Sequence, residues 1–132
     1  MDERKKLMPI AKFENVVPSM SFLEQQEIDA NGPVVLLNTF TVPLEQVDAM
    51  LENWREDALI MKRQPGFISA QLHCGVGAPN VIVNYAVFES MDAYRAAFRN
   101  PEFQATIAKS PEGAVMSPVL LQKLAVEGVC VV

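Results

Sequence analysis

Cysteine, histidine and long apolar runs are all scarce in this sequence, and each scarcity excludes a class of protein. Two cysteines, Cys74 and Cys130, are too few for a disulfide scaffold. The single histidine, His73, precedes Cys74, and neighbouring strand residues point to opposite faces, so the pair predicts no metal site. No apolar run reaches the roughly 18 residues that span a bilayer, so we expect a soluble protein without a membrane partner.

Positive charge is also in deficit. The chain has 11 Lys and Arg against 16 Asp and Glu, a net charge of −5, which argues against nucleic acid or an anionic membrane as a partner. The first residues run from charged side chains directly into Met8, Pro9 and Ile10 without the apolar core of a signal peptide, so we expect a cytoplasmic location. A chain of 132 residues fits one domain, which buries roughly two thirds of the surface exposed when unfolded.

The sequence divides into an arm, a main domain and a tail. Residues 1–32 lack a sustained period and are broken by prolines, which indicates an N-terminal arm. Within it, Ser21 and Glu24 have capping-box spacing, which predicts a short helix at about 22–29. Residues 33–127 carry the periodic segments of one domain, and residues 128–132 form an apolar C-terminal tail.

The periodic segments alternate in a β-α-β-β-α-β order. We expect strands at 34–42, 67–74, 81–88 and 119–126, and helices at 91–99 and 101–109. A further helix of about five turns runs from Pro43 and is ended by residues 64–66. The first helix has apolar residues on one stripe: Leu44, Val47, Leu51, Trp54, Ala58 and Met61. This order predicts an α+β, ferredoxin-like fold whose antiparallel sheet carries its helices on one side.

The hairpin formed by 67–74 and 81–88 has two different faces. Alternation gives a mixed face in which each strand shows polar and aromatic residues, and an aliphatic face. The mixed face is expected to hold Phe67, Ser69, Gln71, His73, Ile82, Asn84, Ala86 and Phe88. This assignment requires Cys74 to lie opposite Val81 across the turn.

Neither face carries a charge, so both need a cover. Two helices cover one side of a four-stranded sheet, and the aliphatic side would otherwise be a large exposed apolar patch. A second copy packed sheet to sheet would cover it, and the N-terminal arm or the apolar tail is the alternative.

The mixed face predicts a pocket for a flat ligand. A buried Asn84 amide without partners would cost about 1–3 kcal/mol, so water, ligand or an internal partner must satisfy it. Small residues at Ser69 and Ala86, flanked by Phe67 and Phe88, leave room between sheet and helices.

Three strings within this region carry a family resemblance: PGFISA at 65–70, VNYAVFES at 83–90, and AYR at 93–95, with Phe98 after them. Over about residues 34–126 the chain resembles the antibiotic biosynthesis monooxygenase family. The resemblance implies a ferredoxin-like fold and a homodimer whose two sheets meet in an α/β barrel.

The resemblance also implies an activity. It is that of a monooxygenase adding one atom of dioxygen to a planar phenolic or anthrone-like substrate, without metal, flavin or other cofactor, because the deprotonated substrate reduces oxygen itself. The implied catalytic residues are His73 as proton acceptor, Asn84 as carbonyl donor and Tyr94 as proton donor to a peroxide. We expect the substrate to be bound by Asn38, Trp54, Phe67 and Phe88.

The chain departs from this pattern at two positions: Phe88 stands where described relatives have tryptophan, and Ile107 where an oxygenase relative has arginine. Two other functions therefore stay open. One is a non-catalytic binding or stress-response dimer of the same fold. The other is haem binding or degradation, whose pattern needs an asparagine matched by Asn38, but also a tryptophan and an axial histidine at the positions of Phe88 and Ile107.

Overall fold

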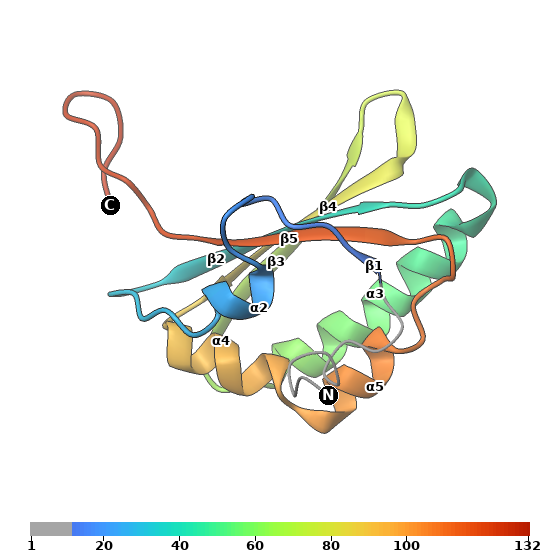
Figure 1. Cartoon of the computed structure of the whole chain (residues 1–132), viewed down its shortest axis with the longest axis horizontal. Helices are drawn as coiled ribbons and strands as arrows, with labels where there is room; N and C mark the ends of the chain where they lie inside the picture. The colour runs from blue at the N-terminus through green and yellow to red at the C-terminus, as the bar shows by residue number, and fades with distance from the viewer. Residues whose placement is uncertain (1–11) are drawn as a thin grey trace.

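One five-stranded sheet, with helices packed on one of its faces, makes up the fold (Figure 1). The computed structural model describes residues 12–132. Its elements are β1 (Lys12–Phe13), α2 (Phe22–Gln25), β2 (Val34–Thr41), a 3-10 turn η1 (Leu44–Gln46), α3 (Val47–Lys62), β3 (Phe67–Gly75), β4 (Ala78–Phe88), α4 (Met91–Phe98), α5 (Pro101–Ile107) and β5 (Val115–Leu121).

The predicted ferredoxin-like fold class is confirmed. The strand order is β1-β5-β2-β4-β3, and the four long strands pair antiparallel, while β1 joins β5 in parallel. Figure 1 shows α3, α4 and α5 on one side of this sheet, and the space between the two layers holds the core. None of the helices in residues 12–132 combines the length and the apolar character that a bilayer crossing requires.

The last strand begins and ends earlier than the predicted range 119–126. Pro118 precedes the predicted range, yet it lies inside β5. The Met116 carbonyl accepts from the Glu14 N–H at 2.8 Å, so the backbone polar groups of Met116 point toward β1. Those of Pro118, two residues later in the strand, point in the same direction. Because β1 pairs only with Val115 and Met116, the missing N–H of Pro118 breaks no bond between strands.

Helix α2, in the arm, is shorter than the predicted 22–29. The Ser21 hydroxyl caps it by accepting from the Glu24 N–H at 3.1 Å. The Gln25 side chain then reaches β5, where its amide donates to the Leu120 carbonyl and its oxygen accepts from the Leu120 N–H, both at 2.8 Å. The arm therefore packs against the domain through a backbone-like pair of hydrogen bonds.

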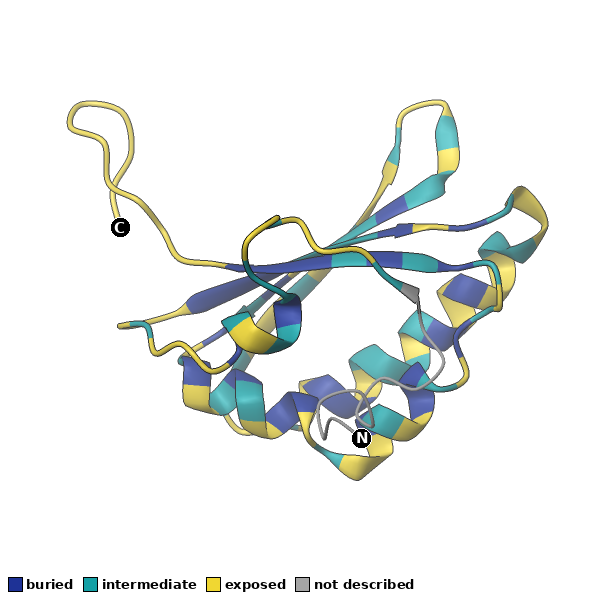
Figure 2. Cartoon of the chain, in the orientation of Figure 1, coloured by how far each residue is buried: buried dark blue, intermediate teal, exposed yellow. Residues whose placement is uncertain are grey.

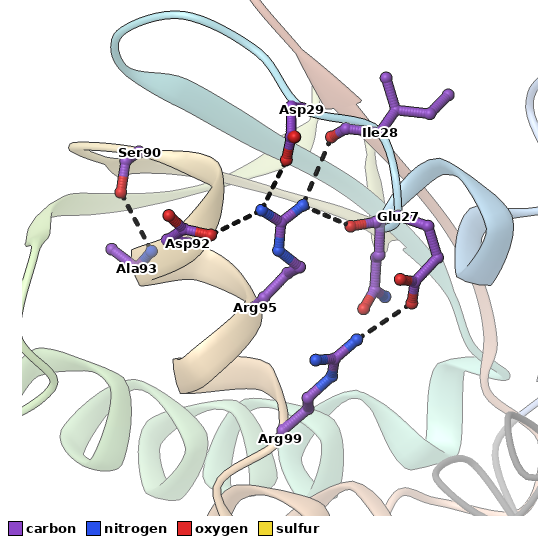
Figure 3. Close-up of polar contacts among 9 residues, drawn as sticks. Glu27, Ile28, Asp29, Ser90, Asp92, Ala93, Arg95 and Arg99 are labelled. Atoms are coloured by element: carbon purple, nitrogen blue, oxygen red, sulfur yellow. Dashed lines mark hydrogen bonds and ion pairs between the residues drawn. The ribbon is translucent and has the colours of Figure 1, made fainter.

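Arg95 on α4 binds the segment that follows α2 and so connects it to the domain (Figure 3). Its guanidinium donates to the Gln26 carbonyl and to an Asp29 carboxylate oxygen, each at 2.9 Å, and to an Asp92 carboxylate oxygen at 2.6 Å. Its side chain is only 14% exposed. The arginine of the AYR string thus ties the arm to the domain.

The predicted register of the hairpin was wrong beyond its first pair. Phe67 lies opposite Phe88 as expected, but a bulge between Phe67 and Ser69 inserts one extra residue into β3. Cys74 therefore pairs with Ile82 and not with Val81. One inserted residue moves every later side chain of β3 to the other face of the sheet.

The buried face of α3 also differs from the predicted stripe. Leu44 and Leu51, which were assigned to the core, are 66% and 40% exposed. The helix instead buries Met50, Asn53, Ile60 and Met61. Figure 2 shows buried residues on the side of α3 that faces the sheet, whereas residues 121–132 are exposed throughout. The helix is rotated by about one residue relative to the stripe, which brings Asp57 inward.

Candidate functional site

A cavity of about 70 Å³ lies between the inner face of the sheet and the helices. Most of its walls are aromatic or aliphatic side chains, including Phe13 and Phe22 from the arm. Four polar side chains also line it: Asn38, Asp57, Asn84 and Tyr94. Each of these four has a buried oxygen without a hydrogen-bond partner among residues 12–132. An unpaired buried polar group costs about 1–3 kcal/mol, so four of them in one cavity indicate a site built for polar ligand groups or water.

The two asparagines come from neighbouring strands at the same level of the sheet. Asn38 on β2 is paired in register with Asn84 on β4. Side chains that oppose each other in an antiparallel pair lie on one face with Cβ atoms roughly 5 Å apart. On its other side Asn38 is paired with Pro118 of β5, which offers no side-chain partner. The two amides therefore form a polar pair within an apolar wall.

Tyr94 reaches the cavity from α4, whose start is capped by the Ser90 hydroxyl accepting from the Ala93 N–H at 3.0 Å. The Tyr94 side chain is fully buried, and its ring packs edge-on against Phe88 with centroids 5.3 Å apart. Burial raises the pKa of the Tyr94 hydroxyl well above its ordinary value. The hydroxyl therefore stays protonated and can only donate or accept a hydrogen bond.

The predicted aromatic residues Phe67, Phe88 and Trp54 all line the cavity. Phe67 packs edge-on against Phe88 with centroids 5.7 Å apart, because the β3 bulge follows Phe67 and leaves it on the inner face. Phe88 is 1% exposed. Trp54 is half-buried and reaches the cavity from α3. These rings give the cavity flat walls.

Asp57 on α3 belongs to the same cavity, and the sequence analysis missed it. Burial raises the pKa of Asp57 from 3.8 to about 7, a hydrogen bond with the Thr106 side chain lowers it, and the charge of Glu56 raises it further. The spacing of Met50, Trp54, Asp57 and Met61, three and four residues apart, carried the signal. The predicted apolar stripe passed through Ala58, which placed Asp57 outside the buried face of the helix.

His73 does not lie in the cavity. The β3 bulge pairs it with Val83 on the outer face of the sheet, where it is exposed. Of the predicted catalytic residues the structure brings Asn84 and Tyr94 together, and the predicted binding residues Asn38, Trp54, Phe67 and Phe88 join them. The proton acceptor expected at His73 therefore has no place among these residues.

Haem ligation does not fit this cavity. The position that would need an axial histidine is Ile107, a buried hydrocarbon side chain in the cavity wall. The sole histidine of the sequence, His73, lies on the opposite face. Among residues 12–132 no three His, Cys, Asp or Glu side chains lie close enough together to hold a metal ion.

The sequence matches a family model over a stretch that contains most of this site. The model describes antibiotic biosynthesis monooxygenase and matches residues 33–109, more than half of the chain. The chain belongs to this family. The match includes Asn38, Asp57, Asn84 and Tyr94, and it ends before β5. No curated protein matches the sequence.

Solved structures with the family fold resemble the chain at low identity. One is SnoaB from Streptomyces nogalater, a cofactor-independent oxygenase, with 26% identity, a TM-score of 0.64, and 74% of this chain and 98% of that one covered. A second, from Shewanella loihica PV-4, is provisionally assigned as a monooxygenase; it has 29% identity, a TM-score of 0.61, and coverages of 75% and 99%. A member of the family from Caulobacter crescentus CB15, at 23% identity, TM-score 0.63 and coverages of 73% and 92%, shares the fold. The family and the likenesses to the Streptomyces and Shewanella proteins support a monooxygenase-type function.

Proposed function

We propose that the protein is a cofactor-independent monooxygenase that oxidises a compact, planar phenolic or anthrone-like substrate with dioxygen. The observation that carries the proposal is the pair of amides, Asn38 and Asn84, whose oxygens have no partner among residues 12–132 and which face a mostly apolar cavity. A conjugated ketone or phenol offers a flat apolar body with polar oxygens at its edge, which matches this wall. The likeness to SnoaB supports the absence of a cofactor.

The chemistry needs only the substrate and dioxygen. Loss of one proton from the substrate leaves an electron-rich anion, which forms a carbon–oxygen bond with dioxygen and becomes a peroxide after protonation. The peroxide then loses water: its O–O bond and the remaining C–H bond break, and a carbonyl group forms. The sum is R₂CH₂ + O₂ → R₂C=O + H₂O.

The cavity residues take distinct roles in this scheme. The Asn84 amide donates to the substrate oxygen on which negative charge develops, and Asn38 binds the same edge of the ring from β2. The Tyr94 hydroxyl, which stays protonated, donates to the peroxide. Phe67, Phe88 and Trp54 hold the ring and exclude bulk water.

The volume of the cavity limits the substrate. An engineered apolar cavity that binds benzene measures about 150 Å³, about twice the 70 Å³ found here. We therefore propose a substrate of one or two rings, which enters as Trp54, the half-buried ring of the wall, swings aside. A larger polyketide would need several buried rings to move.

Oxygen consumption tests the proposal. An oxygen electrode should record uptake with a one-ring hydroquinone and slower uptake with the three-ring anthrone, with a carbonyl product that carries one atom from ¹⁸O₂. Addition of EDTA should not change the rate. Asn84→Ala should lower the rate about 100-fold, the scale for removing one donor to a developing oxyanion. Turnover of Asn84→Ala at the wild-type rate would remove Asn84 from the mechanism.

A second function, non-catalytic binding by the same fold, is favoured by the size of the cavity. The rings of Phe67, Phe88 and Trp54 occupy much of the space between sheet and helices and leave about 70 Å³. Phe88 also lacks the N–H donor that an indole would place there. Saturable binding of a phenol without oxygen uptake from any of the substrates above would select this function.

We also propose that the protein is a homodimer that packs sheet to sheet. Within residues 12–132 no helix lies on the outer face of the sheet, as Figure 1 shows, and the side chains of this face include Val83, Val87 and Tyr85. Tyr85 is 40% exposed, and Leu121 on β5 is 41% exposed. A second copy would remove this apolar surface from water. His73 would then lie at or near the interface, because it shares this face.

A further inference from the structure

We propose that Asp57 is the group that accepts the proton of a phenol bound in the cavity. The inference rests on the proposed function for its chemistry, but it concerns a residue on α3 and not the hairpin residues that the sequence singled out. A reaction that starts by removing a proton needs a base within the dry part of the site. Among residues 12–132, Asp57 is the only cavity-lining residue with a carboxyl group in its side chain.

The position of Asp57 supports this role. It lies one helical turn from Trp54 and one turn from Met61, and all three side chains line the cavity. One carboxylate oxygen, Oδ1, is buried and has no hydrogen-bond partner among residues 12–132. A buried, unpaired carboxylate oxygen is costly, and a hydroxyl group of a bound phenol would satisfy it.

The Asp57 carboxyl group lies beside Thr106 of α5. The Thr106 hydroxyl donates to the Phe103 carbonyl at 2.8 Å, and its nearness lowers the pKa of Asp57. The backbone of Thr106 is fixed, because the Asn53 amide donates to the Thr106 carbonyl at 2.8 Å. Ser110 adds a hydrogen bond from its hydroxyl to the Asn53 amide oxygen at 3.3 Å. The buried Oδ1 of Asp57 is left without a partner among residues 12–132 and is open to the substrate.

The titration of Asp57 suits a base at neutral pH. Burial raises its pKa to about 7, and a general base works best when its pKa lies near the operating pH. The ionisable groups around it are few: Glu56, which pairs with Lys109 at 4.0 Å, and the protonated Tyr94. The strands that face α3 carry no charged side chain in β2, β3, β4 or β5.

The proton balance closes within the cavity. The phenol O–H bond breaks, the proton passes to the Asp57 carboxylate, and the electron pair stays on the substrate as a phenolate. The phenolate is oxidised by dioxygen, which is reduced to the peroxide oxidation level as the carbon–oxygen bond forms. Asp57 then returns its proton to the peroxide, which becomes a hydroperoxide, and the carboxylate is restored. The O–O bond and the remaining C–H bond then break, the C–H proton leaves with the departing oxygen as water, and a carbonyl group forms.

Anaerobic binding of phenol tests the inference without turnover. If the carboxylate form binds the phenol hydroxyl, the Kd of wild-type protein should fall up to about tenfold between pH 6 and pH 8, by calorimetry under nitrogen. Asp57→Asn should abolish this pH dependence. The matched control, Asp48→Asn, removes an exposed carboxylate of the same helix and should behave as wild type. A pH dependence that survives in Asp57→Asn overturns the inference.

Oxygen uptake provides the second readout. The wild-type rate should be low below pH 7 and reach a plateau above it, and Asp57→Asn should lose about 100-fold or more at the plateau. Glu56→Gln should move the midpoint to lower pH and keep the plateau, because Glu56 raises the pKa of Asp57. If Asp57→Asn does not fold, Glu56→Gln tests the role of Asp57 in its place. A pH midpoint of oxygen uptake that does not move in Glu56→Gln then counts against Asp57 as the proton acceptor.

The two proposals can fail separately. Oxygen uptake by Asp57→Asn at the wild-type rate overturns the role of Asp57 and leaves the oxygenase standing. Wild-type protein that consumes no oxygen, but whose phenol affinity follows pH only when Asp57 is present, overturns the oxygenase and supports Asp57 as the acceptor.

Discussion

Asn38 and Asn84 lie opposite each other on adjacent strands, and both present a buried amide oxygen without a partner to the same cavity. Two residues on two strands that meet at one level of a sheet can bind one edge of a ligand together. Their contributions to catalysis should therefore depend on each other.

A double-mutant cycle tests this dependence. Asn38→Ala and Asn84→Ala should each lower kcat/KM about 100-fold, and the double variant should lose less than the product, because neither amide can place the ligand alone. Neither substitution should lower the free energy of unfolding, because each alanine removes a buried polar group that has no partner. Asn100→Ala is the control: Asn100 caps α5 by accepting from the Glu102 N–H at 2.8 Å, so its loss should cost about 1 kcal/mol of stability. Strictly multiplicative losses would contradict the shared edge.

Asp57→Asn should stabilise the protein, and only at higher pH. The folded-state pKa of Asp57, about 7, exceeds the ordinary 3.8, so the folded state binds the proton more tightly than the unfolded state between these values. Stability therefore falls as pH rises from about 4 to 7, and the asparagine variant escapes this loss. Urea unfolding at pH 8 should show a gain of about 2–4 kcal/mol, and at pH 4 almost none. Equal gains at both pH values would contradict the titration.

Arg95→Ala should loosen the N-terminal arm. The guanidinium is mostly buried and joins α4 to Gln26 and Asp29, so its loss should cost about 1–3 kcal/mol in the free energy of unfolding. Limited proteolysis should then cut between α2 and β2 before the domain. Arg55→Ala is the control, because its contact with Glu52 spans 4.0 Å between side chains that are 66% and 67% exposed. Equal effects of the two substitutions would remove the special role of Arg95.

Tyr85→Glu should separate the proposed dimer. A charge at the centre of the outer face would have to be buried between two sheets, which costs far more than leaving it in water. Sedimentation should report a dimer for wild type and a monomer for Tyr85→Glu. Leu44→Glu, at a site that is 66% exposed before α3, should remain dimeric. A monomeric wild type would overturn the sheet-to-sheet assembly.

Periodicity was enough to predict most of the fold, but not which side chains of β3 lie on the inner face of the sheet. The order of strands and helices follows from alternation, the three-four spacing after Pro43 and the cap at Ser90, which are local properties. The bulge after Phe67 is not, because Ile68 and Ser69 alternate as well as any strand pair, and only pairing with β4 reveals the extra residue. That single residue decides whether His73 faces the cavity.

The sequence predicted the amide and aromatic side chains of the candidate site, but it did not predict the carboxylate of Asp57. Asn84 stood out because an amide within an apolar strand needs a reason, and the family strings placed Tyr94 and Phe88. Asp57 sits in a helix with several acidic residues, and a charge on a helix usually faces water. Only the observed rotation of α3, which exposes Leu51 and turns Asp57 inward, distinguishes it from Glu56.

The hydrogen bonds between Gln25 and Leu120 bear on how the chain avoids aggregation. An unpaired outer strand is a template on which another polypeptide can add, and β5 would be one beyond the two residues that β1 covers. By both donating to and accepting from Leu120, the Gln25 side chain occupies the groups that an incoming strand would use. The arm thus blocks the addition of another strand at Leu120, on this edge of the sheet.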